Sequence, residues 1–243
     1  MGQKISGLGV YTSSTLRRLA GSIGDIIDPF NDGRLFRICK NGGVALVRGK
    51  LVVTADVIPN HQDQAVGDDA AIGDRVISID LGATALTANQ YADGYIYIID
   101  GTGEAEMYRI SSHPAAAASA TSVKITLAEE VRLALDDATA RYSLKQHPCS
   151  GVVIAVTDHL DAPIGVPCKA VAAGADEYFL AQVKGPCLVL ADLAWTRGDV
   201  LVNSANVAGA LQPFTAAMVR PLLGVAEDAA ADTEYGQVIL DIP

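Results

Sequence analysis

The sequence predicts an all-β protein: a short-stranded β-barrel or sandwich that carries an inserted β-rich subdomain and an extended N-terminal arm. Short alternating apolar runs recur along the chain, separated by Gly, Pro, Asn and Asp turn signals at about 8–12-residue spacing. No alternation of strands and helices indicates a parallel α/β sheet. Half of the 243 residues are hydrophobic, so the chain is long enough to bury a core without disulfides or metals.

The first segment, residues 1–33, is predicted to be the arm, because Ser, Thr, Gly and Arg alternate there with isolated Leu and Ile. Two interpretations stay open: a flexible tail, and an arm that becomes ordered on a neighbouring subunit. The spacing of apolar residues from Leu16 to Ile27 also fits a short helix, although Gly21 and Gly24 weaken that interpretation.

After the arm, the pattern changes to that of strands. Residues 35–40 alternate and are followed by Asn41-Gly42-Gly43, which predicts a hairpin to residues 44–47 because Asn and Gly tolerate positive φ. A further short strand is expected at 51–54.

Residues 71–149 are predicted to form the inserted subdomain. The segment 114–120 is Ala-rich and is expected to be an exposed loop, while residues 128–135 are the best candidate for a helix. The second and third strands of the subdomain should form a hairpin through Asp100-Gly101-Thr102-Gly103. The expected strands are 76–81, 95–99, 106–110 and 122–127.

The last part of the chain returns to short strands separated by Gly and Pro. Gly185-Pro186 is interpreted as a turn between two of them. The expected strands are 152–156, 165–171, 177–183, 187–190, 199–202 and 237–242.

Residues 49–54 resemble residues 198–203, because each is a Gly turn that leads into a short apolar strand. If both belong to one domain, residues 34–70 and 150–243 form the barrel or sandwich, and 71–149 is inserted between them. Insertions are tolerated at exposed loop tips, and the polar segment before residue 71 has that character.

The formal net charge of −10 and the pI of about 4.7 argue against a nucleic-acid partner, because phosphate binding needs clustered Lys and Arg. No run of 18 apolar residues predicts a membrane span, and the start has no signal-peptide pattern. Met1-Gly2 with Ser6 fits only the short, degenerate myristoylation pattern.

No catalytic, cofactor-binding or metal-binding residue is assigned from the sequence. A zinc site and a calcium site were weighed, but neither the paired Cys or His spacing of zinc sites nor a D-x-D-x-D-G loop is present. The other histidines are expected at turns and loops, the cysteines as reduced core thiols, and Trp195 as a core or rim anchor. The zinc candidates are His147, Cys149, Asp158 and His159; the calcium candidates are Asp68, Asp69, Asp158 and Asp161; the other histidines are His61 and His113; the cysteines are Cys39, Cys149, Cys168 and Cys187.

Several stretches of the C-terminal half resemble phage head decoration proteins. Tyr178 to Pro186 is similar to their "G-E-Y-x-W-x-Q-x-x-G" stretch, and Gly165-Val166-Pro167 precedes it. Trp195 to Leu201 continues the resemblance, and Leu223 to Leu240 is similar to the "G-V-A-x-E/D-x-A" strand, loop and final strand of small capsid cement proteins. The long insert and the arm have no counterpart in that pattern.

The resemblance implies a cement or decoration protein that binds the outside of a tailed-phage head and is made in the host cytoplasm. Its implied partners are the major capsid protein and other copies of itself, as a dimer or trimer at a symmetry axis. It implies no enzymatic activity and no cofactor. Alternatives stay open: another virion subunit of the capsid or tail, a head-displayed carbohydrate-binding or adhesion module, and a phage depolymerase or hydrolase fragment.

Overall fold

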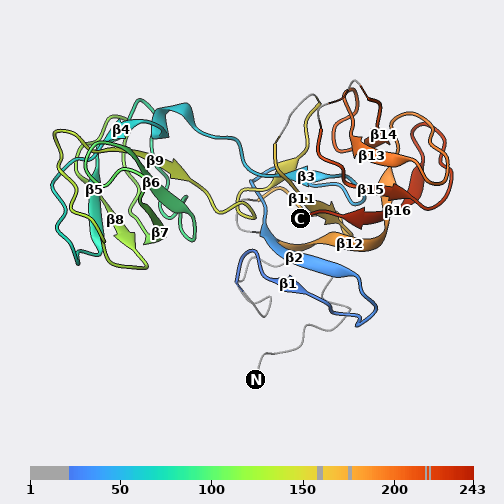
Figure 1. Cartoon of the computed structure of the whole chain (residues 1–243), viewed down its shortest axis with the longest axis horizontal. Helices are drawn as coiled ribbons and strands as arrows, with labels where there is room; N and C mark the ends of the chain where they lie inside the picture. Colours follow the sequence, from blue (N-terminus) through green and yellow to red (C-terminus); the bar gives the residue numbers. More distant parts are fainter. Residues whose placement is uncertain (1–21, 158–160, 175–176, 217, 219) are drawn as a thin grey trace. The chain divides into compact units, whose positions relative to one another are not determined.

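The computed structural model describes residues 22–157, 161–174, 177–216, 218 and 220–243 (Figure 1). Within these residues the chain forms 16 strands and one short 3-10 turn, Pro59–His61. All strand pairs are antiparallel. The predicted all-β class is therefore confirmed.

The chain divides into two compact units, one inserted into the other. Unit 1 comprises residues 1–55 and 148–243, and unit 2 comprises residues 56–147. The insert thus begins 15 residues before the expected position 71 and ends two residues before 149. The segment before residue 71 belongs to unit 2 because its strand β4, Gln64–Ala65, pairs with β9, Arg141–Lys145.

The boundary of the arm also differs from the expected one. Strand β1, Ile26–Ile27, pairs with β2, Leu35–Lys40, so this stretch is a strand and not the end of a helix. The ring of Phe30 lies 5.8 Å from that of Phe36, which is fully buried. Residues 22–33 are therefore part of unit 1, and the rest of the predicted arm lies outside the described residues.

Unit 1 is built on a ten-stranded sheet with the order β10-β3-β11-β12-β16-β15-β13-β14, in which β2 joins β12 and β1 joins β2. The expected hairpin between 35–40 and 44–47 is wrong, because β2 pairs with β1 and β12 instead. The remaining strands are β3, Val52–Val53; β10, Val153–Ile154; β11, Pro163–Pro167; β12, Tyr178–Leu190; β13, Val200–Asn203; β14, Leu211–Pro213; β15, Gly224–Ala226; and β16, Tyr235–Asp241.

Strand β12 runs unbroken for 13 residues, although Gly185-Pro186 predicted a turn that would divide it. Residues 178–184 pair with β2 and residues 181–182 with β11, while residues 184–190 pair with β16. The register with β2 shifts between Gln182 and Lys184, and we call this irregularity of the strand the bend. Gly185 takes a φ of +85°, which glycine adopts without steric cost. The buried amide of Gln182 donates to the carbonyls of Lys184 (3.1 Å) and Pro186 (2.8 Å). These two bonds hold the bend within a continuous strand.

Unit 2 has a six-stranded sheet with the order β4-β9-β6-β7-β8-β5. The predicted hairpin through Asp100–Gly103 is confirmed, as β6 pairs with β7. The helix expected at 128–135 is wrong: Val131 and Leu135 are buried within an irregular segment, and Leu135 bridges Ala70. The strands not yet given are β5, Val76–Ile79; β6, Tyr95–Asp100; β7, Met107–Ser112; and β8, Val123–Leu127.

Both units use the same device to close the loops between their strands. An apolar residue in one loop exchanges two backbone hydrogen bonds, 2.9–3.2 Å long, with an apolar residue in another. In the loop after Ala70, the Asp74 carboxylate accepts the backbone N–H of Ala71 at 2.8 Å. In the loop after Trp195, the Asp199 carboxylate accepts that of Thr196, also at 2.8 Å. The four bridges are Leu46–Val171 and Trp195–Ala230 in unit 1, and Ala70–Leu135 and Leu86–Ala116 in unit 2.

Trp195 is a core residue with an exposed fraction of 2%. Gly236 of β16 lies flat against its ring: a Cβ on Gly236 would be 2.6 Å from Cζ2 of Trp195 and 2.6 Å from Cβ of Ala230. Neither neighbour is the far end of a flexible side chain, so glycine is required here by close packing.

We therefore expect Gly236→Ala to destabilise unit 1 by about 1–3 kcal/mol, the usual cost of overpacking a core. Urea denaturation followed by the fluorescence of Trp195, the only tryptophan, measures this change. Gly174→Ala is the matched control, since its Cβ would meet only Glu177 at 3.6 Å. Equal stabilities of the two variants would contradict the close contact.

Two buried histidines in unit 2, His61 and His113, form hydrogen bonds with Tyr91. His113 Nδ1 lies 2.9 Å from the carbonyl oxygen of Pro114, so it carries the proton, and Nε2 accepts the Tyr91 N–H at 2.9 Å. His61 lies between the same tyrosine and Thr84: its Nδ1 is 2.8 Å from the Tyr91 hydroxyl, and its Nε2 is 3.1 Å from the Thr84 carbonyl oxygen. Because Nε2 of His113 accepts a backbone N–H, the His113 ring must be neutral in this arrangement. Both histidines lie outside the strands, as expected, but they are buried.

Burial, followed by the charge that His61 would carry, lowers the pKa of His113 below its usual 6.5. The unfolded chain therefore binds more protons between the two pKa values. We expect unit 2 to be fully stabilised above about pH 6.5 and to lose this stability as the pH falls through the lower folded pKa. Hydrogen exchange of the Tyr91 amide as a function of pH measures the effect, and a His113→Gln variant should flatten the dependence. An exchange rate in the wild type that follows only intrinsic chemistry would contradict it.

Candidate functional site

The solvent face of the unit 1 sheet carries a continuous row of apolar side chains. The strand register places Val200 opposite Val225, Val225 opposite Ile239, and Ile239 opposite Pro186. We call these four residues the outer row. Val225 and Ile239 are 42% and 39% exposed, and Pro186 is exposed as well.

Alternation along the strands explains which side chains face outward. In β16, Gly236, Val238 and Leu240 are buried, so the residues between them face solvent. Antiparallel sheets usually place polar residues on the solvated face, and contiguous apolar patches there mark interaction surfaces. Leu188 (60% exposed) and Tyr235 (48%) extend the apolar surface beside the outer row.

A pocket of about 590 Å³ opens next to the outer row. Its walls include Pro186 of the outer row and the adjoining Leu188 and Tyr235. Arg34 and Arg48 also line it. This volume lies within the range of about 300–1,000 Å³ that is common for small-molecule sites. The combination of apolar walls and two guanidinium groups suits a ligand or partner segment with an apolar body and a carboxylate.

Arg34 is fixed in place by its neighbours. Its guanidinium pairs with Asp32 at 2.9 Å and lies 4.2 Å from the centre of the Phe30 ring. The hydrogen bond from Arg34 lowers the pKa of Asp32. These contacts hold a positive charge near the pocket, in a protein whose net charge is strongly negative.

Cys168 and Cys187 line the same pocket. The neighbouring Cys187 thiol lowers the pKa of Cys168, and the charge of Arg34 lowers it further. The neighbouring Cys168, together with burial, raises the pKa of Cys187. Cys168 also donates to Oε1 of Gln182 at 3.6 Å. The expected free thiols are therefore present, but their pairing in a pocket was not predicted.

The other two cysteines form a second thiol pair inside the core. Burial, and then the hydrogen bond with Cys149, raise the pKa of Cys39. Cys39 and Cys149 are 0% and 3% exposed, and neither lines the pocket. The two pairs thus differ in access to solvent.

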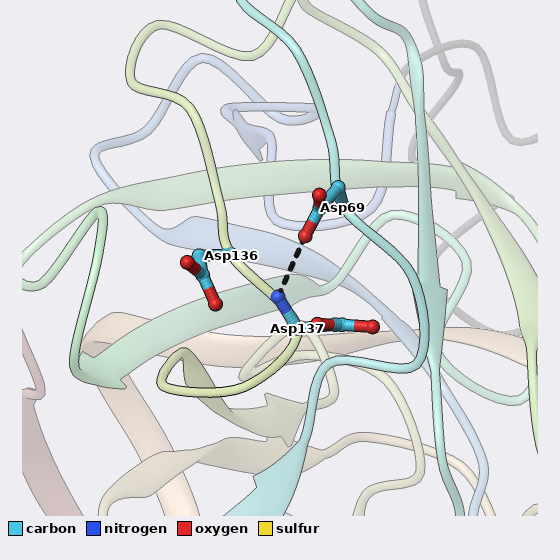
Figure 2. A group of neighbouring side chains, drawn as sticks. All are labelled: Asp69, Asp136 and Asp137. Carbon is cyan, nitrogen blue, oxygen red and sulfur yellow. Dashed lines mark hydrogen bonds between the residues drawn. The ribbon is translucent and has the colours of Figure 1, made fainter.

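Unit 2 holds a group of three exposed carboxylates, Asp69, Asp136 and Asp137, whose oxygens lie within 4.8 Å of one another (Figure 2). Asp69 accepts the backbone N–H of Asp137 at 2.9 Å, and Asp136 accepts that of Ala138 at 2.8 Å. Asp136 therefore caps its own turn, while Asp69 binds the backbone of the other loop. Asp69 was expected with other carboxylates, and Asp136 and Asp137, 67 and 68 residues away in the chain, gave no local signal.

The zinc candidates do not assemble among the described residues. His147 belongs to unit 2, where its ring stacks on Tyr95, while Cys149 belongs to unit 1. Asp158 and His159 lie outside the described residues. Of the calcium candidates, Asp68 pairs with Lys124 at 2.8 Å, and the lysine lowers its pKa.

The comparisons with known proteins add no relative. No model of a known protein family matches the chain, and neither a curated protein nor a solved structure matches it. Among the described residues, no helix is long and apolar enough to cross a membrane.

The geometry of the pocket predicts an order of thiol reactivity. We expect iodoacetamide near neutral pH to modify Cys168 first, because it is half-buried and has the lowered pKa, and the thiolate is the nucleophile. Cys39 and Cys149 should stay protected until the chain unfolds. Peptide mapping after timed alkylation measures the order, with Cys168→Ser as the control. Modification of Cys39 before Cys168 in the folded chain would contradict the assignment.

Proposed function

We propose that this chain is a structural virion protein that binds the outer surface of a tailed-phage head and stabilises the shell. The observation that carries the proposal is the outer row with its adjoining pocket. A row of four apolar side chains across four strands, three of them exposed to water and Val200 half-buried, costs solubility, so a partner surface that covers it explains its presence.

The resemblance to decoration proteins supports the same surface. The stretches that carry it coincide with strands β11, β12, β13, β15 and β16, and the last four of these supply the outer row. Residues that make one binding face in this chain are therefore the residues that resemble the cement proteins.

A small docking face is sufficient on a capsid shell, because many copies bind at once. A shell repeats its surface by symmetry, so each subunit needs only a modest contact when its copies are linked to one another. The partners in this proposal are the major capsid protein and further copies of the chain, on the exterior of the head after synthesis in the host cytoplasm. The negative net charge disfavours binding to packaged DNA.

The test compares two double variants in binding to purified heads. Val225→Ser/Ile239→Ser removes the centre of the outer row and should weaken binding at least about tenfold, as expected for central apolar contacts. Ile72→Ser/Leu133→Ser is the matched control, because these unit 2 side chains are 68% and 48% exposed and lie outside the outer row. It should bind as the wild type does.

Co-sedimentation with heads that lack the protein measures both affinities, and circular dichroism confirms that the variants are folded. Equal binding of the row variant and the wild type would exclude the outer row as the docking face. Absence of the chain from purified particles, together with no binding to heads, would overturn the proposed function itself.

A further inference from the structure

We propose that the unit 1 pocket is a thiol–disulfide exchange site, in which Cys168 attacks an anionic low-molecular-weight disulfide and Cys187 completes an intramolecular Cys168–Cys187 disulfide. The inference does not depend on what the outer row binds. It rests on two thiols from different parts of the chain that meet in one open pocket beside two arginines.

The fold brings the two cysteines together from separate strands. Cys168 directly follows β11, which pairs with the first half of β12, and Cys187 lies in β12 beyond the bend. The side chain of Gln182 contacts both parts of the chain. Its amide N–H groups donate to the carbonyls of Lys184 and Pro186 in β12, and its carbonyl oxygen accepts the hydrogen bond of the Cys168 thiol. The meeting of the thiols is thus a consequence of the bent strand.

The two thiols have different environments and therefore different roles. Cys168 is half-buried and lines the pocket, and the neighbouring Cys187 thiol and the charge of Arg34 both favour its thiolate. Cys187 is only 7% exposed, and the loss of its proton is disfavoured. A small disulfide reaches Cys168 first, so Cys168 is the attacking thiol and Cys187 is the resolving thiol.

The exchange balances in two steps. The Cys168 thiolate attacks one sulfur of the disulfide RSSR, a Cys168–S–S–R bond forms, and RS⁻ leaves. Cys187 then loses its proton to solvent and attacks the Cys168 sulfur, which releases the second RS⁻. The two cysteines are oxidised by two electrons, and RSSR is reduced to two RSH after the leaving thiolates take up protons.

The pocket also selects the class of oxidant. Arg34 and Arg48 line it, and because Asp32 balances the charge of Arg34, the charge of Arg48 is the one that attracts a disulfide carrying carboxylates and repels one carrying ammonium groups. Its volume of about 590 Å³ is large enough for a small-molecule disulfide. We therefore use glutathione disulfide as the anionic probe and cystamine as the cationic one.

The experiment treats the folded full-length chain with glutathione disulfide near neutral pH. Free thiols are counted, and bonds are located by mass spectrometry of peptides made without reduction. We expect two of the four thiols to be lost and a single Cys168–Cys187 bond to form, while the buried pair Cys39–Cys149 stays reduced as an internal control. No thiol loss, or oxidation of the buried pair first, would overturn the proposal.

Two cysteine variants separate the steps. Cys187→Ser should stop the reaction at a stable mixed disulfide on Cys168, whereas Cys168→Ser should leave Cys187 reduced over the same time. A Cys187→Ser chain that takes up no glutathione would contradict the role of Cys168 as the attacking thiol.

Charge selection has its own readout. The wild type should react about tenfold faster with glutathione disulfide than with cystamine, and Arg48→Gln should reduce this ratio without unfolding the chain. Arg48 is preferred to Arg34 for this variant, because Arg34 also packs on Phe30. A ratio near one in the wild type would remove the arginines from the recognition of the oxidant.

Discussion

The bend in strand β12 is the constraint on which the rest of unit 1 depends. One strand must pair with β2 and β11 in its first half and with β16 in its second, and only a bend allows both. Gln182 stabilises the bend by replacing, with its buried amide, bonds that the interrupted ladder no longer supplies. Pro186 of the outer row and Cys187 of the thiol pair both lie just beyond the bend and line the pocket, so the three features share this part of β12.

The reciprocal bridges explain how so many short strands stay in place. A strand of two to six residues gives few ladder bonds, and the loops between strands would otherwise leave backbone groups without partners. Each bridge supplies two such bonds and buries apolar side chains at the same point, as Trp195 and Ala230 do. Among the described residues, two reciprocal bridges of this kind occur in each unit, so the two units share this device despite their separate cores.

The sequence predicted local features well and long-range ones poorly. The β6–β7 hairpin was predicted because its turn residues are adjacent in the chain, and the likeness of 49–54 to 198–203 corresponds to β3 and β13, which both follow bridge residues. The hairpin at Asn41-Gly42 failed because β2 has better partners far away in the chain. Residues 128–135 resembled a helix because the spacing of buried Val131 and Leu135 fits a helical period as well as it fits an anchored loop. The paired thiols had no local signal at all, since 19 positions separate Cys168 from Cys187.

The shared position of the outer row and the pocket has a physical consequence. Pro186 belongs to both, and Leu188 lines the pocket and lies beside the row, so a ligand in the pocket and a partner on the row would meet at β12. A bond between Cys168 and Cys187 would connect the end of β11 to β12 beyond the bend, and so would restrict the angle between the two halves of that strand. Because the row depends on the register of β12 with β16, a change in that angle alters the spacing of Pro186 and Ile239. The proposed exchange site and the proposed docking face therefore share residues of one strand, β12.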